Sequence, residues 1–147
     1  MNKLPDKPSE LIRLALDDLE KAEKSPTYEV NMDRWHTQEE DGICHVCLAG
    51  SVMAFSLDVP AEQTIDLTDW IKKDPEIASK LIALDYLRID AFTEAFSKMD
   101  IEPTLKQIEV LNEWRKSRGL YYGYIHGPSE FKKQRMDLAD KLEEIGL

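Results

Sequence analysis

The sequence has no long hydrophobic run, few cysteines and no segment that would direct the chain across a membrane. Met1–Pro8 contains no apolar stretch of the kind found in secretory leaders. The uncharged segment Cys44–Leu57 is too short to span a bilayer as a helix. The two cysteines lie three positions apart, a spacing that does not suggest a structural disulfide. These absences predict a cytoplasmic protein with no membrane partner.

Motifs that bind nucleotide phosphates are also missing, since the chain contains neither GxxxxGK[ST] nor GxGxxG. No internal repeat or low-complexity stretch is present. A length of 147 residues, with 42% hydrophobic and 33% charged residues, is typical of one globular domain. We therefore expect a single helical domain over residues 1–147, in which residues 1–7 form a flexible N-terminal tail.

Basic residues are absent from one long part of this acidic chain, whose formal net charge is −10. No Lys or Arg occurs between Arg34 and Lys72, although seven acids lie there, at positions 39, 40, 41, 58, 62, 66 and 69. This distribution disfavours binding to DNA or anionic membrane by that part and permits a basic partner, including a host protein that normally binds nucleic acid. The simpler alternative is that the acids only maintain solubility.

The apolar residues recur at helical spacing along the whole chain, which predicts an all-α fold. Turn and capping residues divide the chain into about six helices, packed around a buried apolar central helix at 44–57. The predicted helices cover about residues 9–24, 44–57, 75–88, 92–99, 104–117 and 131–145.

Two local signals qualify this helical prediction. Gly50 lies inside the central helix, where glycine costs about 1 kcal/mol relative to alanine, so we expect another element to approach closely at that point. Thr27–Val30 could form a short strand, but the sequence indicates no partner for it.

The residues with the clearest potential for chemistry are Cys44 and His36. If Cys44 lies in the first turn of a helix, the helix dipole would lower its thiol pKa, and His36 could fold back as a general base. Asp33 or Glu39 could then orient the imidazole. The alternative is that the cysteines are small apolar groups of the core.

A zinc-stabilised module is a further hypothesis. Cys44 and Cys47 could share one helix face and hold one side of a tetrahedral ion, with His36 and His126 as the remaining candidates. The chain has no second CxxC pair and no HxxxH, so no cofactor is expected.

Bases and tyrosines gather in the segment 115–135. The candidate binding residues there are Arg115, Arg118, Tyr121, Tyr122, Tyr124, Lys132 and Lys133. Bases beside aromatic rings suit phosphate contact and stacking on single-stranded nucleic acid. They equally suit a protein interface, or a helix connection whose tyrosines cover the core.

The pair Trp35-His36, followed by CHVCLAGSVMA at 44–54, resembles a family of small tailed-phage and prophage proteins that carry WH and then CxVCLAGxVMA. The resemblance covers about residues 8–90. It implies a phage-encoded accessory protein acting in the host cytoplasm, and it transfers no activity to any residue. The expected function is therefore non-enzymatic binding, and possible inhibition, of a host protein or a nucleic-acid enzyme. A Cys–His thiol enzyme, a zinc-stabilised module and a nucleic-acid-binding module are the alternatives.

Overall fold

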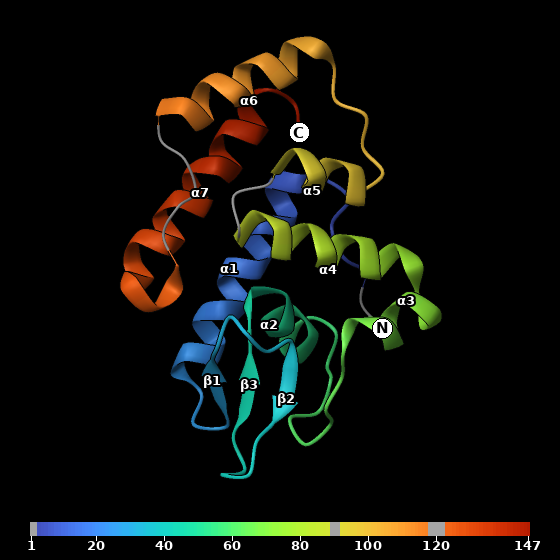
Figure 1. Ribbon diagram of the computed structural model, residues 1–147, viewed down its shortest axis with the longest axis vertical. Coiled ribbons are helices and arrows are strands. Elements are labelled where there is room, and N and C mark those ends of the chain that lie inside the picture. Colours follow the sequence, from blue (N-terminus) through green and yellow to red (C-terminus); the bar gives the residue numbers. More distant parts are fainter. Residues whose placement is uncertain (1–2, 89–91, 118–122) are drawn as a thin grey trace.

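The computed structural model describes residues 3–88, 92–117 and 123–147, which are mostly helical with one small sheet (Figure 1). The expectation of a helical fold is confirmed, but the expectation of an all-α fold is wrong. The described residues contain seven α-helices rather than six: α1 (Pro8–Lys24), α2 (Leu48–Phe55), α3 (Leu67–Lys73), α4 (Pro75–Arg88), α5 (Phe92–Lys98), α6 (Leu105–Ser117) and α7 (Pro128–Glu144). They also contain the strands β1 (Tyr28–Val30), β2 (His36–Gln38) and β3 (Cys44–Val46), and the 3₁₀ turn η1 (Tyr124–His126).

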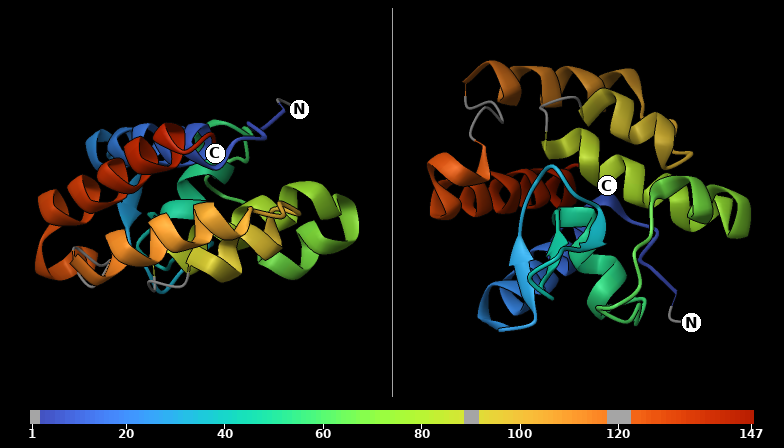
Figure 2. Two further views of the ribbon diagram at one scale, coloured as in Figure 1. Left: turned by 90° about the horizontal axis from the view of Figure 1, so that it is seen from above. Right: turned by 60° about the horizontal axis from the view of Figure 1, so that its bottom comes forward.

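The helices form two layers, seen from above in the left panel of Figure 2. One layer contains α1 and α7, which pack along each other, and the other contains α4, α5 and α6. Helix α2 packs against both α1 and α4, and the sheet lies beside it at the lower end of Figure 1. One continuous apolar core runs from Leu4 to Leu142 through both layers.

Helices α1 and α7 follow directly from their sequence patterns. Helix α1 has Pro8 at its start, and Ser25 beyond its end adopts an extended conformation before Pro26. Helix α7 ends at Glu144 and is followed by Gly146, whose φ of 88° is accessible to glycine, and Leu147 N–H donates to Leu142 O at 2.8 Å. The apolar stripes that join the two helices are buried: Leu11, Ile12, Ala15, Leu16, Leu19, Ala22, Phe131, Leu138, Ala139 and Leu142.

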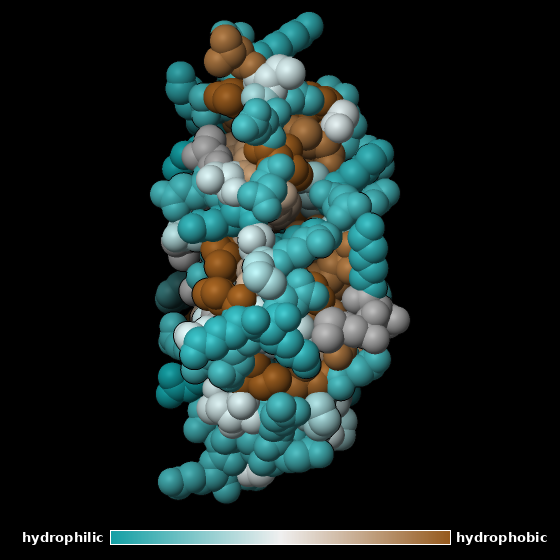
Figure 3. Space-filling view, turned by 90° about the vertical axis from the view of Figure 1, so that its right-hand side faces the viewer, coloured by the Kyte–Doolittle hydropathy of each residue, from teal (hydrophilic) through white to brown (hydrophobic). Residues whose placement is uncertain are grey.

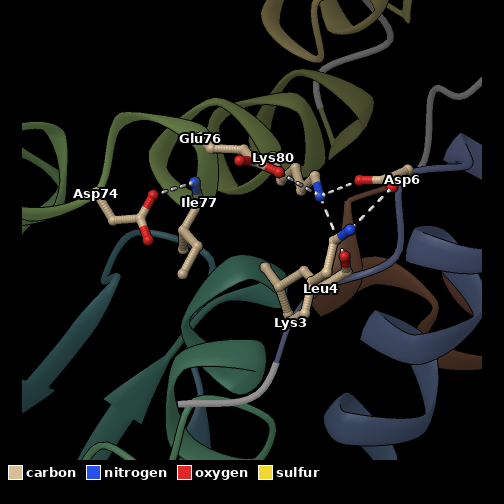
Figure 4. Close-up of polar contacts among 7 residues, drawn as sticks. All are labelled: Lys3, Leu4, Asp6, Asp74, Glu76, Ile77 and Lys80. Atoms are coloured by element: carbon tan, nitrogen blue, oxygen red, sulfur yellow. Dashed lines mark hydrogen bonds and ion pairs between the residues drawn. The ribbon is translucent and has the colours of Figure 1, made fainter.

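Capping residues fix where α4 and α6 begin. Asp74 accepts a hydrogen bond from Ile77 N–H at 3.2 Å, immediately before Pro75 (Figure 4). Thr104 and Gln107 form the reciprocal capping box expected from their spacing: Gln107 N–H donates to Thr104 Oγ1 at 3.2 Å, and Thr104 N–H donates to Gln107 Oε1 at 2.8 Å. Gln107 Nε2 also donates to Ile145 O at 2.8 Å, which ties α6 to the end of α7.

The predicted central helix 44–57 is in fact two elements. Residues 44–46 form strand β3, and the helix covers only Leu48–Phe55. Cys44 and Val46 are buried while His45 between them is partly exposed, which is the period-two pattern of a strand. The prediction that this region is interior is confirmed, because every residue from Val46 to Ala54 is buried.

The sheet has the order β1-β3-β2, so β3 is its middle strand. Strand β1 pairs with β3 in parallel, Tyr28 opposite Cys44, and β2 pairs with β3 antiparallel, Gln38 opposite Cys44. The possible strand at 27–30 is therefore real, and its partner is β3. A further antiparallel bridge joins His36 to Ile65, so the 60–65 loop runs along the outer side of β2.

Trp35, the residue directly before β2, contacts α2 at Gly50. A Cβ atom at position 50 would lie 1.5 Å from the carbonyl oxygen of Trp35 and 3.1 Å from Val46 Cβ. Only glycine leaves room for that carbonyl, so the close approach predicted from the sequence is confirmed.

Residues 3–7 are not a flexible tail, contrary to the prediction. Leu4 is 2% exposed and belongs to the core. The buried ammonium of Lys80, on α4, donates to Leu4 O at 3.1 Å and to Asp6 Oδ1 at 2.9 Å (Figure 4). A buried ammonium requires such partners, so this contact fixes the first segment against α4.

Helix α3 is absent from the sequence prediction because it has only seven residues, too few to show a clear apolar stripe. Its start signal is nevertheless present: Asp66 accepts a hydrogen bond from Asp69 N–H at 3.2 Å. Trp70 is the buried anchor of this helix.

The contact at Gly50 generates a stability prediction. Alanine is the better helix former by about 1 kcal/mol, so Gly50→Ala would stabilise an unobstructed helix. The overlap with the Trp35 backbone opposes this gain, and we expect a net loss of at least ~2 kcal/mol in the free energy of unfolding. Urea denaturation measures it. Gly123→Ala is the control, because its Cβ would meet nothing closer than 3.9 Å. An unchanged stability of Gly50→Ala would contradict the role of this contact.

A buried carboxylate also joins α1 to the end of α2. Asp18 is 1% exposed, and the Ser56 hydroxyl donates to it, with Lys21 Nζ 3.5 Å away. Burial raises the pKa of Asp18 above its ordinary value of 3.8, although Ser56 and Lys21 both oppose the shift. The ionised carboxylate is therefore a cost that the folded chain bears at neutral pH.

Because the pKa of Asp18 is higher in the folded chain than in the unfolded chain, its contribution to stability falls as pH rises above about 4. Asp18→Asn keeps an oxygen that can accept from Ser56 and removes the titration. We expect the free energy of unfolding of this variant, relative to the unsubstituted protein, to increase from pH 4 to pH 7. Denaturation at a series of pH values measures the difference, and a difference that stays constant or decreases would contradict the assignment.

Candidate functional site

The fold brings together the two residues of the predicted thiol–imidazole pair. His36 begins β2 and Cys44 begins β3, and both side chains point into the interior with 0% exposure. Cys44 Sγ lies 3.6 Å from His36 Nδ1 and 3.7 Å from Nε2. Tyr28 and Phe55 enclose the pair, with their ring centroids 5.2 Å apart. The residues were thus correctly paired, although not by the helix that the sequence predicts.

The geometry of this pair does not suit proton transfer. His36 Nδ1 donates to Gln63 O at 2.7 Å, which leaves Nε2 as the acceptor nitrogen. The Cys44 sulfur is almost equidistant from Nδ1 and Nε2. In the plane of the ring, the position between these two nitrogens is occupied by the Cε1–H group, so the sulfur lies over the face of the imidazole ring. The Cys44 sulfur is therefore not on the lone-pair axis of Nε2.

Burial shifts both pKa values away from those of a reactive pair. Desolvation raises the pKa of the Cys44 thiol to about 11, and it lowers the pKa of His36 in spite of the hydrogen bond to Gln63 O. At neutral pH both groups are uncharged. A catalytic thiol needs the opposite shift, toward the thiolate, and access for a substrate. In this arrangement the pair packs the sheet against the core.

The thiol at the helix N-terminus is Cys47, not Cys44. Cys47 is the N-cap residue of α2, and its sulfur accepts a hydrogen bond from Gly50 N–H at 3.4 Å. It is 2% exposed. The sequence prediction placed Cys44 in the first turn of this helix, because the helix was expected to begin at residue 44, four residues before its observed start at Leu48. The capping role of Cys47 was missed for the same reason.

The four candidate metal ligands are not shown to converge. His36 contacts Cys44, Cys47 caps α2, and His126 lies on an exposed turn before α7. In residues 3–88, 92–117 and 123–147, no group of three or more His, Cys, Asp or Glu side chains is placed to hold a metal ion.

Several residues of the basic segment 115–135 form contacts within the fold. Lys132 Nζ lies 2.8 Å from Glu23 Oε1, and Tyr124 donates its hydroxyl hydrogen to the same carboxylate. Burial, followed by the contact with Glu23, raises the pKa of Tyr124. Arg115 lies over the ring of Phe92, whereas Lys133 is exposed. Three other candidates, Arg118, Tyr121 and Tyr122, fall outside the described residues.

The β2–β3 turn and the 60–65 loop, which both carry acidic residues, lie side by side at the lower end of the molecule in Figure 1. Ile65 N–H donates to His36 O at 2.9 Å, and Gln38 N–H donates to Thr64 Oγ1 at 3.3 Å. These bonds bring two separate segments together. The four carboxylates of this region, which we call the acidic end, are Glu39, Glu40, Asp41 and Glu62.

A groove that no sequence signal indicated lies between α5 and α6. One hollow of about 630 Å³ is bounded by α5, α6 and their connection, and a second of about 500 Å³ extends toward Asp6 and the start of α4. Both are lined by Asp100 and Ile101, so they adjoin at these two residues. The apolar lining of this α5–α6 groove is Phe96, Met99, Ile101, Pro103 and Ile108.

Comparisons of the chain with protein-family models, with curated proteins and with solved structures find no match. Among the helices of the described residues, none is both long and apolar enough to cross a membrane. The functional argument therefore depends on the geometry of the chain itself.

The buried thiols generate a prediction about reactivity. We expect both cysteines of the folded protein to resist a disulfide reagent at pH 8 and to react fully in denaturant, because neither sulfur is accessible. Release of the coloured thiol product measures the reaction. A variant with an added surface cysteine, Ser129→Cys, is the control and should react at once. Rapid modification of Cys44 in the folded protein would contradict the interior assignment.

Proposed function

We propose that this chain is a phage-encoded, non-enzymatic accessory protein that binds a basic protein of the infected host through its acidic end. The observation that carries the proposal is the joining of two acidic segments, distant in sequence, at one end of the fold. The β2–β3 turn supplies Glu39, Glu40 and Asp41, and the 60–65 loop supplies Glu62.

The charges at this end are poorly balanced. Arg34 is the one base near the turn in the described part of the chain, and its Nε lies 3.1 Å from Glu39 Oε1. Asp41 accepts a hydrogen bond from Ile43 N–H, which orders the turn without neutralising it. Glu40 and Glu62 are exposed and form no ion pair with any described residue. A negative field of this kind attracts a basic surface and accelerates its association.

The remaining acids between residues 39 and 69, which are Asp58, Asp66 and Asp69, have structural roles in their own turn or helix. Asp66 caps α3, and Asp69 lies in the first turn of that helix, where a negative charge is favourable. Asp58 adopts a positive φ of 54° in the turn after α2. The proposed contact is therefore narrower than the whole acidic tract and centres on the turn and the adjoining loop.

The partner that fits this surface is a host protein whose basic site ordinarily holds nucleic acid. Carboxylates held in a fixed arrangement can occupy such a site in place of phosphates, and inhibition would follow from competition. The support is electrostatic, together with the phage resemblance of the segment 35–54. The other sequence hypotheses have weaker support, because the thiol pair is buried and both Lys132 and Tyr124 of the 115–135 segment contact Glu23.

The proposal is tested by affinity capture from bacterial lysate on the immobilised protein. We expect one or more basic proteins to be retained at low salt, released by rising salt and displaced by duplex DNA, because all three effects follow from charge neutralisation. Glu40→Gln/Glu62→Gln should retain several-fold less.

The control is Glu10→Gln/Glu130→Gln, which removes the same charge at two exposed residues outside the acidic end and outside the lining of the groove. Equal loss of retention in both double variants would indicate a response to net charge alone and would contradict the proposed site. An empty column at low salt would also count against the proposal.

A further inference from the structure

Apolar side chains in the α5–α6 groove and beside it are left uncovered by the fold. Leu105, in the first turn of α6, is 81% exposed and lies beside the groove rather than in its lining, whereas Ile108, one turn further along the same helix, lines it. Among its described positions, α6 buries only Leu111 and Trp114. Figure 3 faces the side of the molecule on which α3 and the α5–α6 connection lie, and it shows hydrophobic patches bordered by hydrophilic side chains.

The floor and the rim of the groove differ in character. Phe96 is 3% exposed and closes the floor, while Ile101 and Pro103 are half-buried along the wall. Asp100 and Glu102 stand at the rim, both exposed, and neither forms an ion pair with a residue of the described ranges. The groove thus combines an apolar surface with two carboxylates that form no ion pair with a described residue.

The second hollow, toward α4, is also bordered by acidic side chains. Its acids, Asp6 and Glu76, face the buried ammonium of Lys80, at 2.9 Å and 3.5 Å (Figure 4). Because Lys80 is nearly covered and is shared with the carbonyl of Leu4, its charge is balanced locally. The unbalanced charge along the groove therefore remains that of Asp100 and Glu102.

We infer that the α5–α6 groove is a docking site for a basic amphipathic segment of a partner protein. The apolar face of that segment covers Ile101, Leu105 and Ile108, and its Lys or Arg side chains reach Asp100 and Glu102. An amphipathic segment in an apolar groove is a recurrent mode of peptide recognition, and flanking charges set its orientation. A second copy of this chain fits less well, because each copy carries a net charge of −10 and presents acids at this rim.

The site can be altered without disturbing the fold. Leu105→Gln removes the exposed apolar group and retains a good helix former. Asp100 has a positive φ of 56°, a conformation that asparagine tolerates, so Asp100→Asn/Glu102→Gln removes both charges at little conformational cost. The matched control is Glu10→Gln/Glu130→Gln, which removes equal charge at exposed residues that belong neither to the groove nor to the acidic end.

The test uses a fluorescein-labelled leucine–lysine peptide of about 14 residues, patterned as an amphipathic helix, and measures binding by fluorescence polarisation. We expect Leu105→Gln and Asp100→Asn/Glu102→Gln each to weaken binding at least about fivefold, and the control to weaken it less than about twofold. A serine–lysine peptide of equal charge should bind much more weakly than the leucine–lysine peptide. Circular dichroism confirms that each variant is folded.

Three results would overturn the inference. Equal affinity of the unsubstituted protein and Leu105→Gln would show that the peptide does not use the apolar surface. Equal weakening by the two double variants, or equal binding of the serine–lysine peptide, would reduce the interaction to net charge. Sedimentation that finds a dimer for the unsubstituted protein and a monomer for Leu105→Gln would assign the groove to a second copy. Because lysate capture reports on Glu40 and Glu62, the two proposals can fail independently.

Discussion

The arrangement of this molecule depends on the contact between the carbonyl of Trp35 and the backbone of Gly50. No side chain can be placed at position 50 without meeting that carbonyl. The contact holds the start of β2 directly against α2, so the next residue, His36, enters the interior. Strand β2 then positions β3 on one side and the 60–65 loop on the other. One glycine in a buried helix thereby links the helical core to the sheet, and through the sheet it places the acidic end.

The contact between Trp35 and Gly50 also determines the chemistry of Cys44 and His36. A cysteine and a histidine in contact would form a reactive pair at an accessible helix end, where dipole and solvent both favour the thiolate. Here the sheet encloses them, and desolvation favours the neutral form of each. Proximity is therefore insufficient evidence for catalysis when both partners are covered. The distances to the two ring nitrogens support this conclusion independently, because they place the sulfur over the ring face.

The long helices and their caps were predictable because many residues contribute to each signal. The stripes of α1 and α7, the start at Asp74 and the capping box of Thr104 and Gln107 all appear as expected. The sheet was not predictable, since each strand has three residues and β1 pairs with residues sixteen positions further along the chain. An uncharged run has no visible boundary between strand and helix, so Cys44 was placed in the first turn of a helix whose N-cap is in fact Cys47. The α5–α6 groove depends on tertiary packing alone, and no local pattern indicated it.

Charge pairing within the fold explains why both proposed surfaces select a basic partner. The C-terminal third is slightly basic by sequence, yet several of its bases are paired or covered within the fold: Lys132 contacts Glu23, Lys141 contacts Glu144, and Arg135 is buried over Phe131. Four acids are not paired in this way, because they form no ion pair with any described residue: Glu40, Glu62, Asp100 and Glu102. The outward field near these positions is therefore more negative than the local sequence suggests. The acidic end offers only charge, which favours rapid and salt-sensitive association. The groove adds an apolar surface, which can distinguish among basic partners by shape. Both properties together would allow one small protein to attract many basic surfaces and retain few of them.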